Sequence, residues 1–288
     1  MNRLLSFLML LFISANGFSQ DIPLSQILIP KEDWKKASLN NIDGTFSAIT
    51  SDSEGSLYLA NSKNKSILNI DPMNKANEVV TGISAQALAV DSMGGIYIAS
   101  DSNIFFASKV NAKTSKIIEG MECVAICSLK QGKCYGAVPG EKAIYLFDKT
   151  GAKKKVSSEN VGVISLAVSN DETTLFAGSA DGRSVFTFRI EQNGELSAKD
   201  RYVAPRKPRE GIAGSIPGMT LDKANRIYAA TSLGVQVFDP TGRLCGVLLQ
   251  PDFPKFAGAI AFAGPDKTTL YALVGQQLYT RKILFPAK

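Results

Sequence analysis

Hydrophobic and polar positions alternate in a short phrase that the chain repeats six times. Each copy is a polar turn followed by aliphatic, aromatic and small residues, as in residues 52–60 and 91–99. A period near 40 residues with hairpin chemistry in every copy is typical of a β-propeller. We therefore predict an all-β fold, a six-bladed β-propeller. The repeated aromatics fall 39, 38, 41, 52 and 43 residues apart, at Tyr58, Tyr97, Tyr135, Phe176, Tyr228 and Tyr271.

The other strands of each blade follow from the segments around this phrase. Each repeat opens with a strand of small apolar residues, such as residues 87–90 or 165–168, and a turn rich in Asp, Asn, Ser and Gly follows it. Third strands end at Asp71, Asp148 and Asp239, whose carboxylates are expected to cap turns. The predicted fourth strands are residues 152–157, 197–203 and 243–249.

The last repeat ends at residues 278–284 and leaves no residues for a fourth strand. We expect the N-terminal segment around Trp34 to Leu39 to supply that strand and close the ring. Such a closure removes two exposed strand edges. Trp34, the only tryptophan, is then expected to pack between blades rather than to hold a ligand.

The first 19 residues have the pattern of a secretory signal peptide. Arg3 precedes an apolar run at residues 4–13, and small residues then lead to a cleavage site near Ser19. No later segment is long and apolar enough for a membrane span. We expect an exported protein, periplasmic or secreted, in which residues 20–288 form one propeller domain and act as a monomer.

The net charge adds little to the functional interpretation. The formal charge of +6 falls to 6 − 1 = +5 when Arg3 is removed. The basic residues form short clusters, of which residues 153–155 and 206–209 are the clearest. Nucleic-acid binding would need such clusters on one face with aromatics between them. We interpret them instead as solvated loops and expect no nucleic-acid partner.

The cysteines and the lack of histidine restrict the possible chemistry. Cys123, Cys127 and Cys134 crowd one repeat without paired metal-ligand spacing. In an oxidising compartment Cys127 and Cys134 could form a disulfide across a hairpin, and buried core thiols are the alternative. The chain has no histidine, which excludes Ser-His-Asp and Cys-His catalysis and His-ligated zinc. An enzyme here must use carboxylates, Lys, Tyr or an oxygen-held metal.

Five segments carry a resemblance to known proteins: residues 166–176, 218–222, 226–230, 234–242 and 260–271. They resemble the regucalcin/gluconolactonase family, also called senescence marker protein-like. The resemblance implies a six-bladed propeller with one calcium or zinc ion at the top of the central channel. In that family a Glu of the first blade, an Asn of the fourth and an Asp of the fifth hold the metal, which polarises a lactone carbonyl and helps to activate water.

The resemblance places the three metal-ligand positions on Ser47, Ile164 and Pro217. None of these side chains is anionic, and a hard cation needs charged oxygen ligands. A second-blade Asn that meets substrate becomes Gln86. The predicted third-blade position is Glu122, with Cys123 as the alternative register. The predicted channel floor is therefore Ser47, Gln86, Glu122, Ile164, Pro217 and Ala259.

Three functional hypotheses follow. The first is a metal-dependent lactonase or related hydrolase with a rearranged site, which would use calcium or zinc. The second is a non-catalytic propeller that binds a small molecule, glycan or protein and needs no cofactor. The third is a structural or interaction module. Because the ligand positions have lost their carboxylates, we favour a non-catalytic binding or interaction protein, since fold alone does not fix function.

Overall fold

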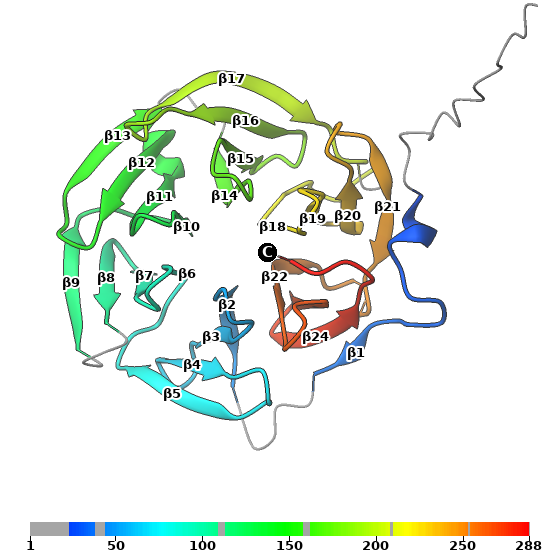
Figure 1. Cartoon of the computed structure of the whole chain (residues 1–288), viewed down its shortest axis with the longest axis horizontal. Coiled ribbons are helices and arrows are strands. Elements are labelled where there is room, and N and C mark those ends of the chain that lie inside the picture. Colours follow the sequence, from blue (N-terminus) through cyan, green and yellow to red (C-terminus); the bar gives the residue numbers. More distant parts are fainter. Residues whose placement is uncertain are drawn as a thin grey trace, which may run out of the picture.

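The computed structural model describes residues 23–37, 44–108, 113–157, 162–207, 210–252 and 254–287. Six antiparallel sheets of four strands stand in a ring around a central axis (Figure 1). This arrangement confirms the predicted six-bladed β-propeller. The signal peptide expected at residues 1–19 lies outside the described residues. Within the described ranges, no helix has the length and apolar character to cross a membrane.

Each blade has four strands, counted from the axis outward, and in blades 1 to 5 the four are consecutive in the chain. Blade 1 contains β2 (Phe46–Ser51), β3 (Leu57–Asn61), β4 (Ser66–Ile70) and β5 (Ala76–Thr81). Blade 2 contains β6 (Ala87–Val90), β7 (Ile96–Ser100), β8 (Asn103–Ala107) and β9 (Thr114–Glu119). Blade 3 contains β10 (Ala125–Ser128), β11 (Lys133–Val138), β12 (Ala143–Asp148) and β13 (Lys153–Ser157). Two short 3-10 helices are η1 (Leu24–Gln26) and η2 (Pro139–Glu141).

Blades 4 and 5 follow the same order, and blade 6 is completed from the N-terminal side. Blade 4 contains β14 (Val163–Val168), β15 (Thr174–Ser179), β16 (Val185–Ile190) and β17 (Leu196–Val203). Blade 5 contains β18 (Gly218–Leu221), β19 (Ile227–Thr231), β20 (Gly234–Phe238) and β21 (Leu244–Leu249). Blade 6 contains β22 (Ala257–Ala263), β23 (Thr269–Val274), β24 (Gln277–Lys282) and β1 (Lys35–Lys36). The predicted fourth strands correspond to β13, β17 and β21.

The ring closes through β1, the outermost strand of blade 6. β1 pairs antiparallel with β24, with Lys35 opposite Thr280. This confirms the predicted closure by the N-terminal segment, of which residues 38–39 lie outside the described ranges. Trp34 packs against the apolar cluster that blades 5 and 6 share, as expected for a residue between blades.

The repeated phrase forms the hairpin between the first two strands of a blade. In blade 2, Asp91 Oδ1 accepts hydrogen bonds from the N–H groups of Met93 (2.9 Å) and Gly95 (2.8 Å). The aromatic of the phrase, Tyr97, is fully buried, and its hydroxyl donates to the carbonyl of Gly132 in blade 3 at 2.6 Å. The phrase thus makes a turn and also links neighbouring blades.

The acidic residues that end the third strands also cap turns. Oδ1 of each accepts the N–H two residues later, at 2.9 Å for Asp71, 2.8 Å for Asp148 and 2.8 Å for Asp239. These side chains therefore have the structural role predicted for them, because local side-chain acceptors favour turns.

The basic clusters lie at the surface. The lysines at 153–155 are exposed on β13, and Lys155 forms an ion pair with Glu141 at 3.0 Å. Residues 206–207 are also exposed, and residues 208–209 lie outside the described ranges. The described part of both clusters therefore has the solvated setting that is usual for charged side chains.

The structure decides between the two alternatives for Cys127 and Cys134 in favour of free core thiols. Cys127 is opposite Tyr135 in the ladder, and Cys134 is opposite Ser128. Successive side chains of a strand point to opposite faces, so Cys127 packs toward blade 4 and Cys134 toward blade 2. Both are free thiols. Burial raises the pKa of each, which keeps them protonated near neutral pH.

The innermost strands of blades 5 and 6 approach each other closely at Gly218. A Cβ atom on Gly218 would lie 2.8 Å from the Cα of Ala259 and 3.1 Å from the carbonyl oxygen of Gly258. Both are backbone atoms, so the two blades would have to move apart. A glycine is needed here for space, since its φ is not in the left-handed region.

We expect Gly218→Ala to lower the free energy of unfolding by about 1–3 kcal/mol, the usual cost of overpacking. Urea unfolding followed by circular dichroism measures the change. Gly140→Ala in η2 is the matched control, because a Cβ there meets no atom within 4 Å; a change within about 0.5 kcal/mol is expected. Equal losses for both variants would show that the close approach is not responsible.

Candidate functional site

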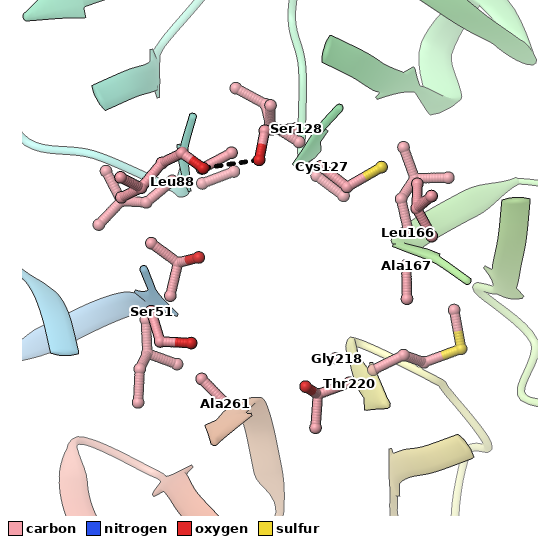
Figure 2. A pocket seen from close by; sticks show the side chains of 18 of the residues that line it. Ser51, Leu88, Cys127, Ser128, Leu166, Ala167, Gly218, Thr220 and Ala261 are labelled. Carbon is pink, nitrogen blue, oxygen red and sulfur yellow. Dashed lines mark hydrogen bonds between the residues drawn. The ribbon is translucent and has the colours of Figure 1, made fainter. Parts of the chain in front are cut away.

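A cavity of about 630 Å³ lies on the axis of the ring. The innermost strands β2, β6, β10, β14, β18 and β22 form its wall (Figure 2). Hairpin-turn residues such as Asp52 and Asn170 line it at one end, which we call the turn end. Ala287 also contributes to the lining, and the C-terminal end of the chain lies at the centre of the ring in Figure 1.

The ladders give each lining residue a height along the channel. The residues paired with the repeated aromatics form the middle layer: Thr50, Ala89, Cys127, Ala167, Thr220 and Ala261. One residue earlier in each strand is the aliphatic layer: Ile49, Leu88, Ile126, Leu166, Met219 and Ile260. Three residues before the middle layer is the first layer: Ser47, Gln86, Val124, Ile164, Pro217 and Gly258.

The first layer contains four of the six predicted floor residues, namely Ser47, Gln86, Ile164 and Pro217. In blade 3 its member is Val124, and Glu122 lies two residues earlier with an exposed side chain. In blade 6 its member is Gly258, and Ala259 follows it. The ladders therefore correct the register that the sequence suggested for blades 3 and 6.

The missed register in blade 3 has a physical reason. Its hairpin turn runs from Leu129 to Gly132 and lacks the aspartate that marks the other turns, so the sequence gives no fixed point for alignment. Ser47, Gln86, Pro217 and Ala259 line the cavity, whereas Glu122 and Ile164 do not.

The polar side chains of the first layer are engaged with neighbouring blades. Ser47 Oγ donates to the carbonyl of Ala85 at 2.6 Å. Gln86 Nε2 donates to the carbonyls of Cys123 (3.0 Å) and Asp101 (3.2 Å). The Ser47 bond joins blade 1 to the segment just before β6 of blade 2. The bond from Gln86 to Cys123 joins blade 2 to the segment just before β10 of blade 3. The side chains thus act as links in the ring.

The first layer does not fit the divalent metal that the family resemblance implies. A hard cation such as calcium is held by several oxygen atoms, usually including carboxylates. The first layer has no carboxylate: Ser47 Oγ is bonded to Ala85, and Gln86 could offer only a neutral amide oxygen. In addition, no group of three or more His, Cys, Asp or Glu side chains that could hold a metal occurs in the described part of the chain.

The carboxylates that line the cavity are at the turn end. Asp52 Oδ1 accepts the N–H groups of Glu54 and Ser56, both at 2.9 Å. Glu172 Oε1 accepts the N–H of Lys130 at 2.8 Å. These bonds, like those that Asp91 Oδ1 accepts in blade 2, hold turns of the fold.

Sequence reasoning missed the hydroxyl-bearing part of the wall. Thr50 and Thr220 belong to the middle layer, and Ser51 follows in β2; all three line the cavity and are half-buried. A usable signal was present, since Thr50 and Thr220 each precede the aromatic of their repeat by eight residues (58 − 50 and 228 − 220). In a tight hairpin, a separation of eight residues places the threonine directly opposite the aromatic residue on the next strand.

Known proteins share this fold and sequence pattern. The gluconolactonase of Zymomonas mobilis is 21% identical over 242 residues, which is 83% of this chain and 60% of that protein, so the chain spans less than two thirds of its relative's length. A gluconolactonase from Xanthomonas campestris superposes with a TM-score of 0.73 at 14% identity, covering 89% of this chain and 91% of the other. A calcium-binding regucalcin from Agrobacterium tumefaciens gives 0.70 at 15% identity, covering 89% and 96%.

The family model described as the SMP-30/gluconolactonase/LRE-like region matches residues 45–275, which is most of the chain and includes the inner strands of all six blades. The structural neighbours show the same propeller, and the resemblance noted in the sequence points to the same group. The chain belongs to the SMP-30/gluconolactonase/LRE-like family.

Proposed function

We propose that this chain is an exported, non-catalytic member of its family that binds a small molecule in the central channel. The first layer carries the proposal, since a lactonase of this family needs a metal there and the chain offers Ser47, Ile164 and Pro217 at the ligand positions. Two of these side chains have no oxygen, and Ser47 Oγ is already bonded to Ala85.

The geometry of the channel supports a binding role. A cavity of about 630 Å³ has the size of small-molecule sites. Its wall is built on the innermost strands, which sheets on all sides hold in place, so the site is largely preformed. A rigid site loses little entropy when a ligand binds.

A metal-dependent lactonase with a rearranged site is the second candidate. The family match and the gluconolactonases among the relatives favour it. It requires a metal site built from residues outside the first layer, because the first layer has no anionic oxygen.

Titration of the mature protein with calcium and with zinc by calorimetry, alongside turnover of a panel of aldonolactones, separates the two candidates. We expect no heat of metal binding in the micromolar range and no turnover. The gluconolactonase from Xanthomonas campestris, assayed in parallel, is the positive control for turnover. Micromolar metal binding together with lactone hydrolysis would overturn the proposal in favour of the lactonase. N-terminal sequencing of exported material tests the leader, with Gln20 as the expected first residue.

A further inference from the structure

The hydroxyl groups of the channel wall fall into two kinds. Ser47, Ser128 and Ser165 each donate to a carbonyl of a neighbouring blade at 2.6 Å. The bond of Ser128 is drawn in Figure 2. The hydroxyls of Thr50, Ser51 and Thr220 have no hydrogen-bond partner among the described residues, although all three line the cavity. The first kind belongs to the fold, and the second is free to bind a ligand.

The free hydroxyls lie on one side of the channel. Thr50 and Ser51 come from blade 1 and Thr220 from blade 5. In Figure 2, Ser51 and Thr220 face the channel with Ala261 of blade 6 between them. Because Thr50 and Thr220 are both in the middle layer, they stand at the same height. Together they present donors and acceptors to one edge of a bound molecule.

The opposite side of the channel, from blades 2 to 4, is mainly apolar. The apolar residues there include Leu88 and Ala89 of blade 2 and Leu166, Ala167 and Val168 of blade 4. Blade 3 adds the thiol of Cys127 and also Ser128, whose hydroxyl is bonded to Val90. In Figure 2, Leu88 lies across the channel from Thr220, and Leu166 lies across it from Ser51. This side therefore offers mainly dispersion contacts and apolar area.

Two ligand chemistries are poorly matched to this wall. No charged side chain belongs to the middle or aliphatic layers, and a charged group placed there would lose its hydration without gaining a counter-charge. No aromatic side chain is among the described residues that line the cavity. Sugar rings and planar rings would therefore lack a stacking partner.

We propose that the channel selects an uncharged molecule with one hydrogen-bonding edge and one aliphatic side. The polar edge meets Thr50, Ser51 and Thr220, and the aliphatic side packs against blades 2 and 4. This inference rests on the proposed function, because it assigns a ligand class to the same cavity.

The C-terminal segment lies at the turn end of the channel. There the carbonyl of Pro286 accepts the N–H of Lys223 at 2.8 Å, and Ala287 N–H donates to the carbonyl of Lys267 at 2.9 Å. These bonds hold the segment beside the axis (Figure 1), so we expect the ligand to enter from the first-layer end.

Calorimetry with 1,2-octanediol tests the proposal, because this probe is neutral, has two adjacent hydroxyls and carries an aliphatic chain. Octanoate, octylammonium and glucose are the comparison probes, which add a negative charge, add a positive charge or remove the chain. We expect the diol to bind at least tenfold more tightly than each of the three. Equal or tighter binding of octanoate, octylammonium or glucose would overturn the inference.

Substitutions locate the bound probe. Thr50→Val, Ser51→Ala and Thr220→Val each remove one free hydroxyl with little change of shape, and each is expected to weaken diol binding about three- to tenfold. Thr187→Val removes a hydroxyl of the third strand of blade 4, outside the cavity lining, and should leave binding unchanged. Diol binding that is insensitive to all three channel variants would contradict the proposal.

The metal titration distinguishes a failure of the ligand class from a failure of the proposed function. If neither the diol nor either metal binds, the ligand class is wrong and the non-catalytic assignment stands. If calcium or zinc binds with lactone turnover, the proposed function is wrong, and the ligand class that rests on it is wrong as well.

Discussion

Replacing Asp222 by alanine is expected to lower the free energy of unfolding by about 3–5 kcal/mol, the usual cost of leaving one member of a buried ion pair alone. Asp222 and Arg226 are 0% and 2% exposed, and Asp222 Oδ2 accepts a hydrogen bond from Arg226 Nε at 2.6 Å. The guanidinium carbon lies 3.8 Å from the ring centre of Phe285. That contact cannot replace the lost negative charge, so the guanidinium would remain buried and uncompensated.

Asp52→Ala is the matched control for this prediction. Asp52 has the same place in blade 1 and caps its turn through the N–H groups of Glu54 and Ser56. Ser56 stands where blade 5 has Arg226, so Asp52 has no buried arginine beside it. We expect a loss of about 1 kcal/mol for a lost cap. Urea unfolding of both variants isolates the contribution of the charge pair, and equal losses would show that turn capping explains the whole effect.

A double variant tests whether the unpaired guanidinium of Arg226 causes this loss of stability. Replacing a buried ion pair by apolar residues of similar volume is often neutral. Asp222→Ala combined with Arg226→Met should therefore recover much of the stability that Asp222→Ala loses. No recovery would indicate that the guanidinium is not the source of the cost.

The repeats predicted the fold because their information is local. An aspartate, a turn and an aromatic at fixed separation specify a hairpin, and six such hairpins near a 40-residue period specify the ring. In blade 3 the prediction of register was wrong because this local information is missing. The turn there begins at Leu129, where blades 1, 2 and 5 have a capping aspartate, and Glu122 was placed two residues away from the first layer. The two alternatives for Cys127 and Cys134 stayed open for a similar reason, because the register decides which face of the hairpin each side chain takes.

The candidate site was only partly predictable, since its chemistry depends on contacts between blades. The resemblance placed Ser47, Gln86 and Pro217 on the channel wall, where the structure has them. Whether a hydroxyl is free depends on the carbonyl that the next blade presents. Ser128 is bonded to Val90, 38 residues earlier in the chain, and no local pattern distinguishes it from Ser51.

Removing residues 20–37 is expected to destabilise the propeller by at least about 5 kcal/mol. Ile27 is completely buried in the cluster shared by blades 5 and 6, and Leu28 and Trp34 pack against the same cluster. Burial of each large apolar side chain contributes about 1.5–3 kcal/mol. The deletion also removes the backbone bond from Ala37 N–H to the carbonyl of Leu278 (2.8 Å). Both the core and the closing strand of blade 6 are therefore lost.

The exposed edge of β24 gives this deletion a second consequence. An unpaired strand edge is a template for association with other chains, so we expect concentration-dependent oligomers in size-exclusion chromatography as well as a lower urea midpoint. The chain that begins at Gln20 is the control and should be stable and unassociated. Ile27→Ala, expected to cost about 2–5 kcal/mol, gives a graded measurement if the truncated chain does not fold. A synthetic peptide of residues 20–37 should restore the midpoint, because it supplies the same strand and the same buried side chains in trans. A truncated chain as stable as the control would mean that β1 does not hold the ring closed.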